Sequence, residues 1–401
     1  MMKNIVRKKT DWVYLGIYLH NVGLLLFWSL QLSAFKFLMY LGPLLFLFGL
    51  FVNRKYASVR NKPLSYYMLL AISLLMWLRF DINGANGGTV QDMNGAFAMV
   101  FFLLLLYDCK LFRLDDMKRW ATIAAVTGMV FSLFNWNRIL AANAYQGSYS
   151  SNEGAVVLAM AAIYILMGIG FFLFVFRYCS KRFTLFSLFT AMLTVVIAMT
   201  SGRRGYTVVN LMFVFQFVCF VVFYAKGVKR MGALLFVALF ILGCYYYYAA
   251  FKDTQLAMFF NRLDTDSRSD VFSYWDKEMS KSIWYWIWGK GVSGGYWDGD
   301  FGMVRPGIEN GMRHMILKGG LSYFLGYIVL TLRMAYLGWF KSSNKLLKGV
   351  ALYIICLFIF IFVWGTPSVS YMHLFMWMGY TWICNPKVRR MNDHEVMNYL
   401  R

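Results

Sequence analysis

The chain has 401 residues, of which 60% are apolar, 20% aromatic and only 14% charged. A water-soluble domain carries roughly 25% charged residues, so this composition excludes a soluble enzyme, a secreted disulfide scaffold and a disordered chain. The formal net charge of +22 is typical of basic cytoplasmic loops beside anionic lipid, so it does not require a nucleic-acid partner. We therefore expect an all-α polytopic membrane protein.

Apolar runs separated by charged breaks predict about twelve transmembrane helices. Residues 1–401 are expected to form a single integral membrane domain, with no cleavable signal peptide. The predicted spans, in chain order, are 11–31, 35–52, 65–80, 95–107, 120–137, 155–176, 183–200, 206–225, 231–250, 312–332, 349–365 and 368–385.

The distribution of charge orients these spans. If the N-terminus is cytoplasmic, the loops on that side and the C-terminal tail over 386–401 hold 26 basic and six acidic residues, whereas the opposite side holds 14 and 12. Such an asymmetry follows the positive-inside rule. Both termini are therefore predicted to be cytoplasmic.

One connection is much longer than the others. Residues 251–311 form a predicted external loop of about sixty residues, and loops of that length usually carry function. The loop contains Arg268 and a series of tryptophans beginning with Trp275. Tryptophan rings can stack on sugars, although packing against the membrane explains them equally well.

The segment Thr200-Ser201-Gly202-Arg203-Arg204-Gly205 is a very short external turn between two predicted spans. Arginines at the membrane edge are costly and are usually functional. Planar guanidinium groups and flanking glycines suit phosphate, so Arg203 and Arg204 predict an anion site, with lipid-headgroup contact as the alternative.

The segment Glu309-Asn310-Gly311-Met312-Arg313-His314 leads into the tenth predicted span. Glu309 is either a carboxylate base or the partner of Arg313 one turn later. A second external loop carries Arg138 and, after a run of small polar residues, Asn152. These small polar residues either cap a helix or bind sugar hydroxyls.

In this order, the motifs resemble those of the bacterial O-antigen polymerase and O-antigen ligase superfamily. The turn at 200–205 resembles its Ser-x-Ser-Arg-Gly-type turn, and Arg268, Trp275 and Gly289-Lys290-Gly291 resemble its Arg, Trp and Gly-x-Gly loop pattern. The segment Glu309-Asn310, followed by Leu317-Lys318-Gly319-Gly320-Leu321, is similar to its His-Asn segment, and Gly147 to Asn152 is similar to a Gly-x-x-x-x-Asn element. Glu309 stands where ligases have histidine, which is closer to the polymerases.

The resemblance implies a GT-C-like membrane glycosyltransferase in the bacterial inner membrane, with one long periplasmic loop carrying short helices. Its expected partners are undecaprenyl-pyrophosphate-linked donor and acceptor glycans, membrane lipids and a possible chain-length regulator. We expect metal-independent, inverting transfer without a cofactor. Arg203, Arg204 and Arg268 would bind the pyrophosphate and Glu309 or His314 would be the base, while Arg138, Asn152, Trp275 and Asn310 would contact the glycan.

Three other functions remain open. A ligase would transfer finished glycan to a lipid core instead of extending it. A transporter of lipid-linked sugars would also want outward arginines, but it should have broken helices or charged residues within its spans. A sugar O-acyltransferase would need a buried base such as His20 or His373, which more simply hydrogen-bond within the bundle.

Overall fold

The computed structural model describes residues 2–58, 62–79, 101–142, 149–224, 269–300, 302–308, 310–363 and 368–400, with a few isolated residues between 227 and 246. Within this part of the chain, seven helices are long and apolar enough to cross a membrane. Contacts divide the chain into two compact units. Unit 1 comprises residues 1–17, 43–117 and 267–401, and unit 2 comprises residues 18–42 and 118–266.

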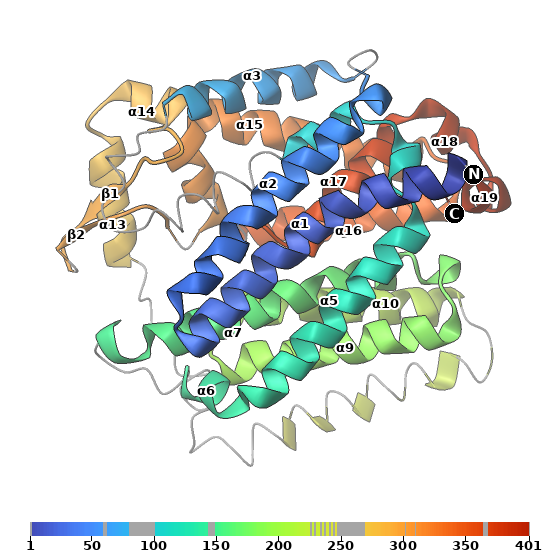
Figure 1. Cartoon of the computed structure of the whole chain (residues 1–401), viewed down its shortest axis with the longest axis horizontal. Helices are drawn as coiled ribbons and strands as arrows, with labels where there is room; N and C mark the ends of the chain where they lie inside the picture. Colours follow the sequence, from blue (N-terminus) through green and yellow to red (C-terminus); the bar gives the residue numbers. More distant parts are fainter. Residues whose placement is uncertain are drawn as a thin grey trace. The chain divides into compact units, whose positions relative to one another are not determined.

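Unit 1 is organised around the long helix α15 (Gly311–Phe340), which packs against α3 (Leu64–Leu78), α14 (Ile283–Trp288), α16 (Lys345–Val363) and α17 (Tyr371–Cys384) (Figure 1). Gly338 of α15 brings the backbones of α15 and α16 together, since a Cβ there would lie 2.9 Å from the Cβ of Ala351. The hydroxyl of Tyr380 lies 2.9 Å from that of Thr331, so a polar contact also joins α17 to α15.

Two short helices, α18 (Pro386–Arg390) and α19 (Asp393–Leu400), end unit 1. Figure 1 shows the N- and C-termini at one end of this unit, while α14 lies at its other end. The unit also contains the first part of α1 (Met2–Leu30) and the last part of α2 (Lys36–Val52).

Unit 2 is built on three helices: α7 (Tyr149–Met167), α9 (Lys181–Thr200) and α10 (Arg204–Tyr224). Helix α9 packs against both α7 and α10. The unit also contains the short helices α6 (Trp136–Ala141) and α8 (Phe171–Phe174) and most of the longer α5 (Leu114–Phe134). Gly170 lets the ring of Phe213 pack onto the backbone before α8, and the buried side chains here are mostly alanine, isoleucine, leucine and phenylalanine.

Many helix boundaries agree with the predicted spans, because runs of apolar residues end at charged or polar ones. The prediction 183–200 corresponds to α9, and 349–365 corresponds to α16. Two spans differ: within 95–107, residues Phe101–Leu106 form a 3₁₀ helix, and within 368–385 the helix α17 has only 14 residues. Most of the predicted span 231–250 lies outside the described residues, so a total of twelve remains a prediction.

The described part of the long predicted loop is structured. It contains α13 (Ser269–Met279), α14 and a two-stranded antiparallel sheet of β1 (Tyr296–Asp298) and β2 (Met303–Arg305). Tyr296 pairs with Arg305, and Asp298 pairs with Met303. Short helices were expected there, whereas the hairpin was not, because strands of three residues leave no clear periodic pattern.

Candidate functional site

The turn between α9 and α10 in unit 2 is a Schellman motif. Gly202 has φ of +70°, the backbone N–H of Arg203 donates to Ala198 O at 2.7 Å, and that of Gly202 donates to Met199 O at 3.0 Å. These bonds satisfy carbonyls at the end of α9, and glycine adopts the left-handed conformation without a Cβ penalty. The turn therefore ends one helix and starts the next within three residues.

Arg203 lies far along α7 from the first residue of that helix. The hydroxyls of Tyr164 on α7 and Tyr206 on α10 are 2.7 Å apart, and Arg203 precedes Tyr206 by three residues, about one helical turn. Tyr164 lies 15 residues after Tyr149, the first residue of α7, which corresponds to about 22 Å of helix rise. The arginine turn is therefore level with the second half of α7.

The Arg203 guanidinium has no hydrogen bond or ion pair within the described residues, and its Nε is buried without a partner there. A charged group in such surroundings is costly unless a counter-charge reaches it. Arg204, the first residue of α10, donates its backbone N–H to Gly202 O at 3.3 Å. The turn thus offers an anion a half-buried guanidinium next to two tyrosine hydroxyls.

Arg138, a predicted glycan contact, caps a helix. Its two terminal nitrogens donate to the carbonyls of Ser29 and Trp28, in the last turn of α1. Carbonyl groups at a helix C-terminus attract cations, so this arginine is engaged in fixing α6 to the end of α1.

Trp275, on α13 of unit 1, is 2% exposed and packs edge-on against Trp286 of α14, with ring centroids 5.4 Å apart. The guanidinium of Arg313 lies 4.9 Å from the Trp275 ring centroid, and its Nη1 is 3.3 Å from Asp276 Oδ1. The predicted sugar-stacking ring therefore joins α13 to α14 and to the start of α15. Its indole Nε1 is buried and has no hydrogen-bond partner among the described residues.

Asn310 and His314 lie at the start of α15. The Asn310 side chain accepts from Arg313 N at 3.0 Å as the N-cap and donates from Nδ2 to Phe362 O at 3.1 Å. His314 is half-buried, its ring packs on Gly307, and its Nδ1 has no partner within the described part of the chain. Asn310 thus has a structural role, whereas the Nδ1 atom of His314 makes no hydrogen bond within the described residues.

Helix α15 is broken at Gly320, where φ is +71° and ψ is −177°. The break exposes carbonyls, which the segment after α14 uses: Lys290 N donates to Leu317 O at 2.7 Å, and Gly291 N donates to Lys318 O at 2.9 Å. A Cβ on Gly320 would lie 2.5 Å from Trp288 N, so only glycine lets α14 approach this closely.

Lys318 and Arg79 hold the segment in this break. The sequence did not predict either contact. Lys318 is 3% exposed, and its ammonium donates to Val292 O at 2.7 Å and Gly294 O at 2.8 Å. Arg79, the C-cap of α3, donates from Nη1 to Gly289 O at 2.9 Å and from Nη2 to Trp288 O. The sequence signal for Lys318 was a lysine before Gly319-Gly320 inside an otherwise apolar span.

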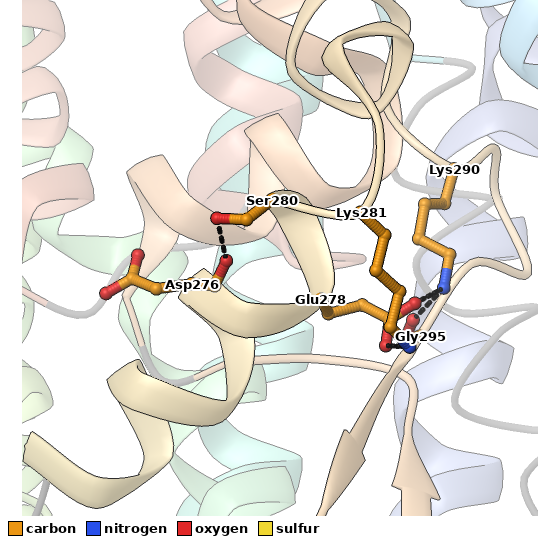
Figure 2. A network of polar contacts seen from close by, with 6 residues as sticks. All are labelled: Asp276, Glu278, Ser280, Lys281, Lys290 and Gly295. Atoms are coloured by element: carbon orange, nitrogen blue, oxygen red, sulfur yellow. Dashed lines mark hydrogen bonds and ion pairs between the residues drawn. The ribbon is translucent and has the colours of Figure 1, made fainter.

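Figure 2 shows an ionic network that joins α13 to the segment after α14. Lys290 donates to Glu278 Oε1 and Gly295 O, both at 2.6 Å, and Lys281 donates to Glu278 Oε2 at 2.7 Å. Partial burial alone would raise the pKa of Glu278, but the hydrogen bonds from Lys281 and Lys290 outweigh it and hold the pKa below its ordinary value. The network therefore fixes α13 to the loop as an ionised cluster.

The structure does not describe the side chains of three further predicted site residues. Arg268 and Glu309 lie outside the described residues, and Asn152 is described only as part of the backbone of α7. No group of three or more histidine, cysteine or acidic side chains placed to hold a metal ion is found in the described ranges. Comparison of the chain with models of protein families, with curated proteins and with solved structures gave no match.

Proposed function

We propose that this protein is a glycosyltransferase of the O-antigen polymerase type, acting on glycans linked to a membrane-embedded polyprenyl pyrophosphate. The observation that carries the proposal is the half-buried Arg203 guanidinium, which has no protein counter-charge in the described residues and lies about one helical turn before Tyr206, whose hydroxyl contacts that of Tyr164. A diphosphate on a lipid carrier supplies that counter-charge at the depth where its carrier lies.

The reaction requires a stabilised leaving group. The acceptor hydroxyl attacks the anomeric carbon, the bond from that carbon to the pyrophosphate oxygen breaks with inversion, and the hydroxyl proton passes to a base. Arginine stabilises the leaving dianion without titrating, and a charge pair 4 Å apart is worth about 4 kcal/mol at an effective dielectric constant of 20. Arg203, with Arg204 and Arg268, has this role in the proposal, and Glu309 or His314 is the base.

The test uses purified protein and a synthetic polyprenyl-pyrophosphate oligosaccharide. A ladder of products supports polymerase activity, whereas a single adduct on a lipid core identifies a ligase. Arg203→Ala should abolish the ladder, and Arg203→Lys should reduce it, because lysine keeps the charge without the bidentate fork. Arg182→Ala, at the exposed start of α9, is the matched control and should leave the ladder unchanged. A full ladder from Arg203→Ala would contradict the proposal.

The break in α15 favours transport of lipid-linked sugars as a second candidate. Broken helices and buried charges within spans are typical of transporters, and α15 has both at Gly320 and Lys318. In proteoliposomes, a transporter would move labelled lipid-linked glycan between leaflets and leave it chemically unchanged. Formation of a ladder without such movement would exclude this candidate.

A further inference from the structure

The segment that follows α13 packs against the interior of the long apolar helix α15 and not against its end. Gly320 is nine residues after Gly311, the first residue of α15, which corresponds to about 14 Å of helix rise. The end of α14 lies at the level of Gly320, because Ser322 Oγ donates to Ile287 O at 2.6 Å and Lys290 N bonds to Leu317 O. The end of α14 therefore lies alongside the interior of the apolar helix Gly311–Phe340 and not beside its first turn.

Side chains hydrogen-bond to the backbone carbonyls of this segment, as non-helical backbone within a membrane requires. Side chains donate to its carbonyls one after another: Ser322 to Ile287, Arg79 to Trp288 and Gly289, Lys318 to Val292 and Gly294, and Lys290 to Gly295. In a loop surrounded by water, the solvent would make most of these bonds. Non-helical backbone at membrane depth persists only where protein groups replace that water.

The outer surface of α14 is apolar. Its sequence, Ile-Trp-Tyr-Trp-Ile-Trp, contains no charge, and Ile283 and Trp284 are 66% and 62% exposed. Exposed apolar residues flank this surface on both sides: Leu78 directly precedes the Arg79 that binds Trp288, and Leu321 directly follows Gly320. The exposed stripe then continues along α15 through Leu325, Val329 and Leu332.

We propose that α14 is a re-entrant interfacial helix whose Ile283–Trp284 face is immersed in bilayer lipid, at the boundary between headgroups and acyl chains. The partner of this surface is phospholipid. Exposed, uncharged tryptophan and isoleucine are favourable at the boundary between headgroups and acyl chains, whereas the polar surface of a soluble protein would not favour contact with them. The predicted external loop is thereby partly a lipid-facing surface, which agrees with the alternative that its tryptophans pack against the membrane. This inference does not depend on the proposed glycosyl transfer.

The experiment uses the wild-type protein in nanodiscs that contain a phospholipid with a photoactivatable diazirine on its acyl chain. After illumination, peptide mapping should find lipid adducts on 283–288 and on the exposed stripe of α15, but not on the exposed polar residues Lys277, on α13, and Ser280, directly after α13. Labelling of the α15 stripe without labelling of 283–288 would overturn the proposal. Absence of labelling from both would also overturn it, since α15 sets the depth of α14.

A matched pair of variants tests the same surface. Trp284→Asp should lower the adduct yield on 283–288 several-fold while the α15 stripe stays labelled. Trp297→Asp changes a tryptophan of similar exposure on β1 and should leave the yield on 283–288 unchanged. Equal yields from wild type and Trp284→Asp would contradict the proposal, and labelling of the α15 stripe in each sample confirms that the variant has folded into the bilayer.

Discussion

Arg79 Nη1 donates a 2.9 Å hydrogen bond to the carbonyl oxygen of Gly289, 210 residues further along the chain. The bond joins two helix C-termini, because Arg79 is the C-cap of α3 and Gly289 is the C-cap of α14. The carbonyl ends of both helices attract a cation, so one guanidinium stabilises both at once.

Replacement of Arg79 should therefore loosen α14. Arg79→Ala removes both donors from the end of α14 and is expected to lower the free energy of unfolding by about 1 kcal/mol, since the side chain is largely exposed. Arg79→Lys should recover part of this loss. Thermal unfolding in detergent measures the effect, with Lys277→Ala, an exposed cation on α13, as the control. Equal stability of the Arg79→Ala and Lys277→Ala proteins would refute the role.

Two glycines of α15 should respond in opposite ways to alanine. Gly320→Ala places a Cβ against the backbone of Ile287 and Trp288 at positive φ, so a loss of about 3 kcal/mol or more is expected. Gly326→Ala adds a methyl group whose nearest neighbour would be 3.8 Å away, so a helix interior should gain about 0.5–1 kcal/mol. Chemical denaturation of both variants checks the contrast, which a neutral Gly320→Ala would disprove.

Lys318 should be essential to the fold of the break. Lys318→Met keeps the apolar stem but leaves the buried carbonyls of Val292 and Gly294 without their donor, so a loss of about 3 kcal/mol is expected. Lys281→Met, which changes a lysine with 62% side-chain exposure, should cost far less. Limited proteolysis of the 289–295 segment gives a local readout, and equal cleavage of the two variants would argue against the role of Lys318.

The Glu278 network should make stability depend on acidity. Because the folded pKa of Glu278 is lowered, the carboxylate contributes stability above its unfolded pKa of about 4.3, and that contribution is lost as the pH falls through the folded value. Wild-type protein should therefore exceed Glu278→Gln in stability near pH 6, and the difference should shrink on acidification below about pH 4. Unfolding midpoints measured across that range test this, and a constant difference would rule out the ionised network.

Arg138 separates a structural role from a glycan-binding role. Arg138→Ala should destabilise the protein by about 1 kcal/mol through loss of the cap on Ser29 and Trp28, with glycan affinity unchanged in the folded fraction. Thermal unfolding and binding of soluble repeat-unit oligosaccharide distinguish the two. A fall in binding without a fall in stability would support the predicted glycan role.

The sequence alone determined the membrane character of the chain and the positions of many helices. Apolar runs need no partner to be recognised, and a charged or polar residue ends them, so α9 and α16 were predicted to within a few residues. The short turn at 200–205 was also predicted, because a polar segment separates two apolar runs there, whereas the left-handed conformation of Gly202 came from the structure.

Only the tertiary structure decided what Arg79, Lys318 and Gly320 do. The break in α15 depends on bonds from Lys290 and Gly291, and on the close approach of Ile287, none of which is local to Gly320. A lysine in an apolar run has no visible acceptor until the chain folds, because the carbonyls that accept its protons belong to a distant segment. Periodicity reports which face of a helix is apolar, but it does not report which distant backbone the helix must satisfy.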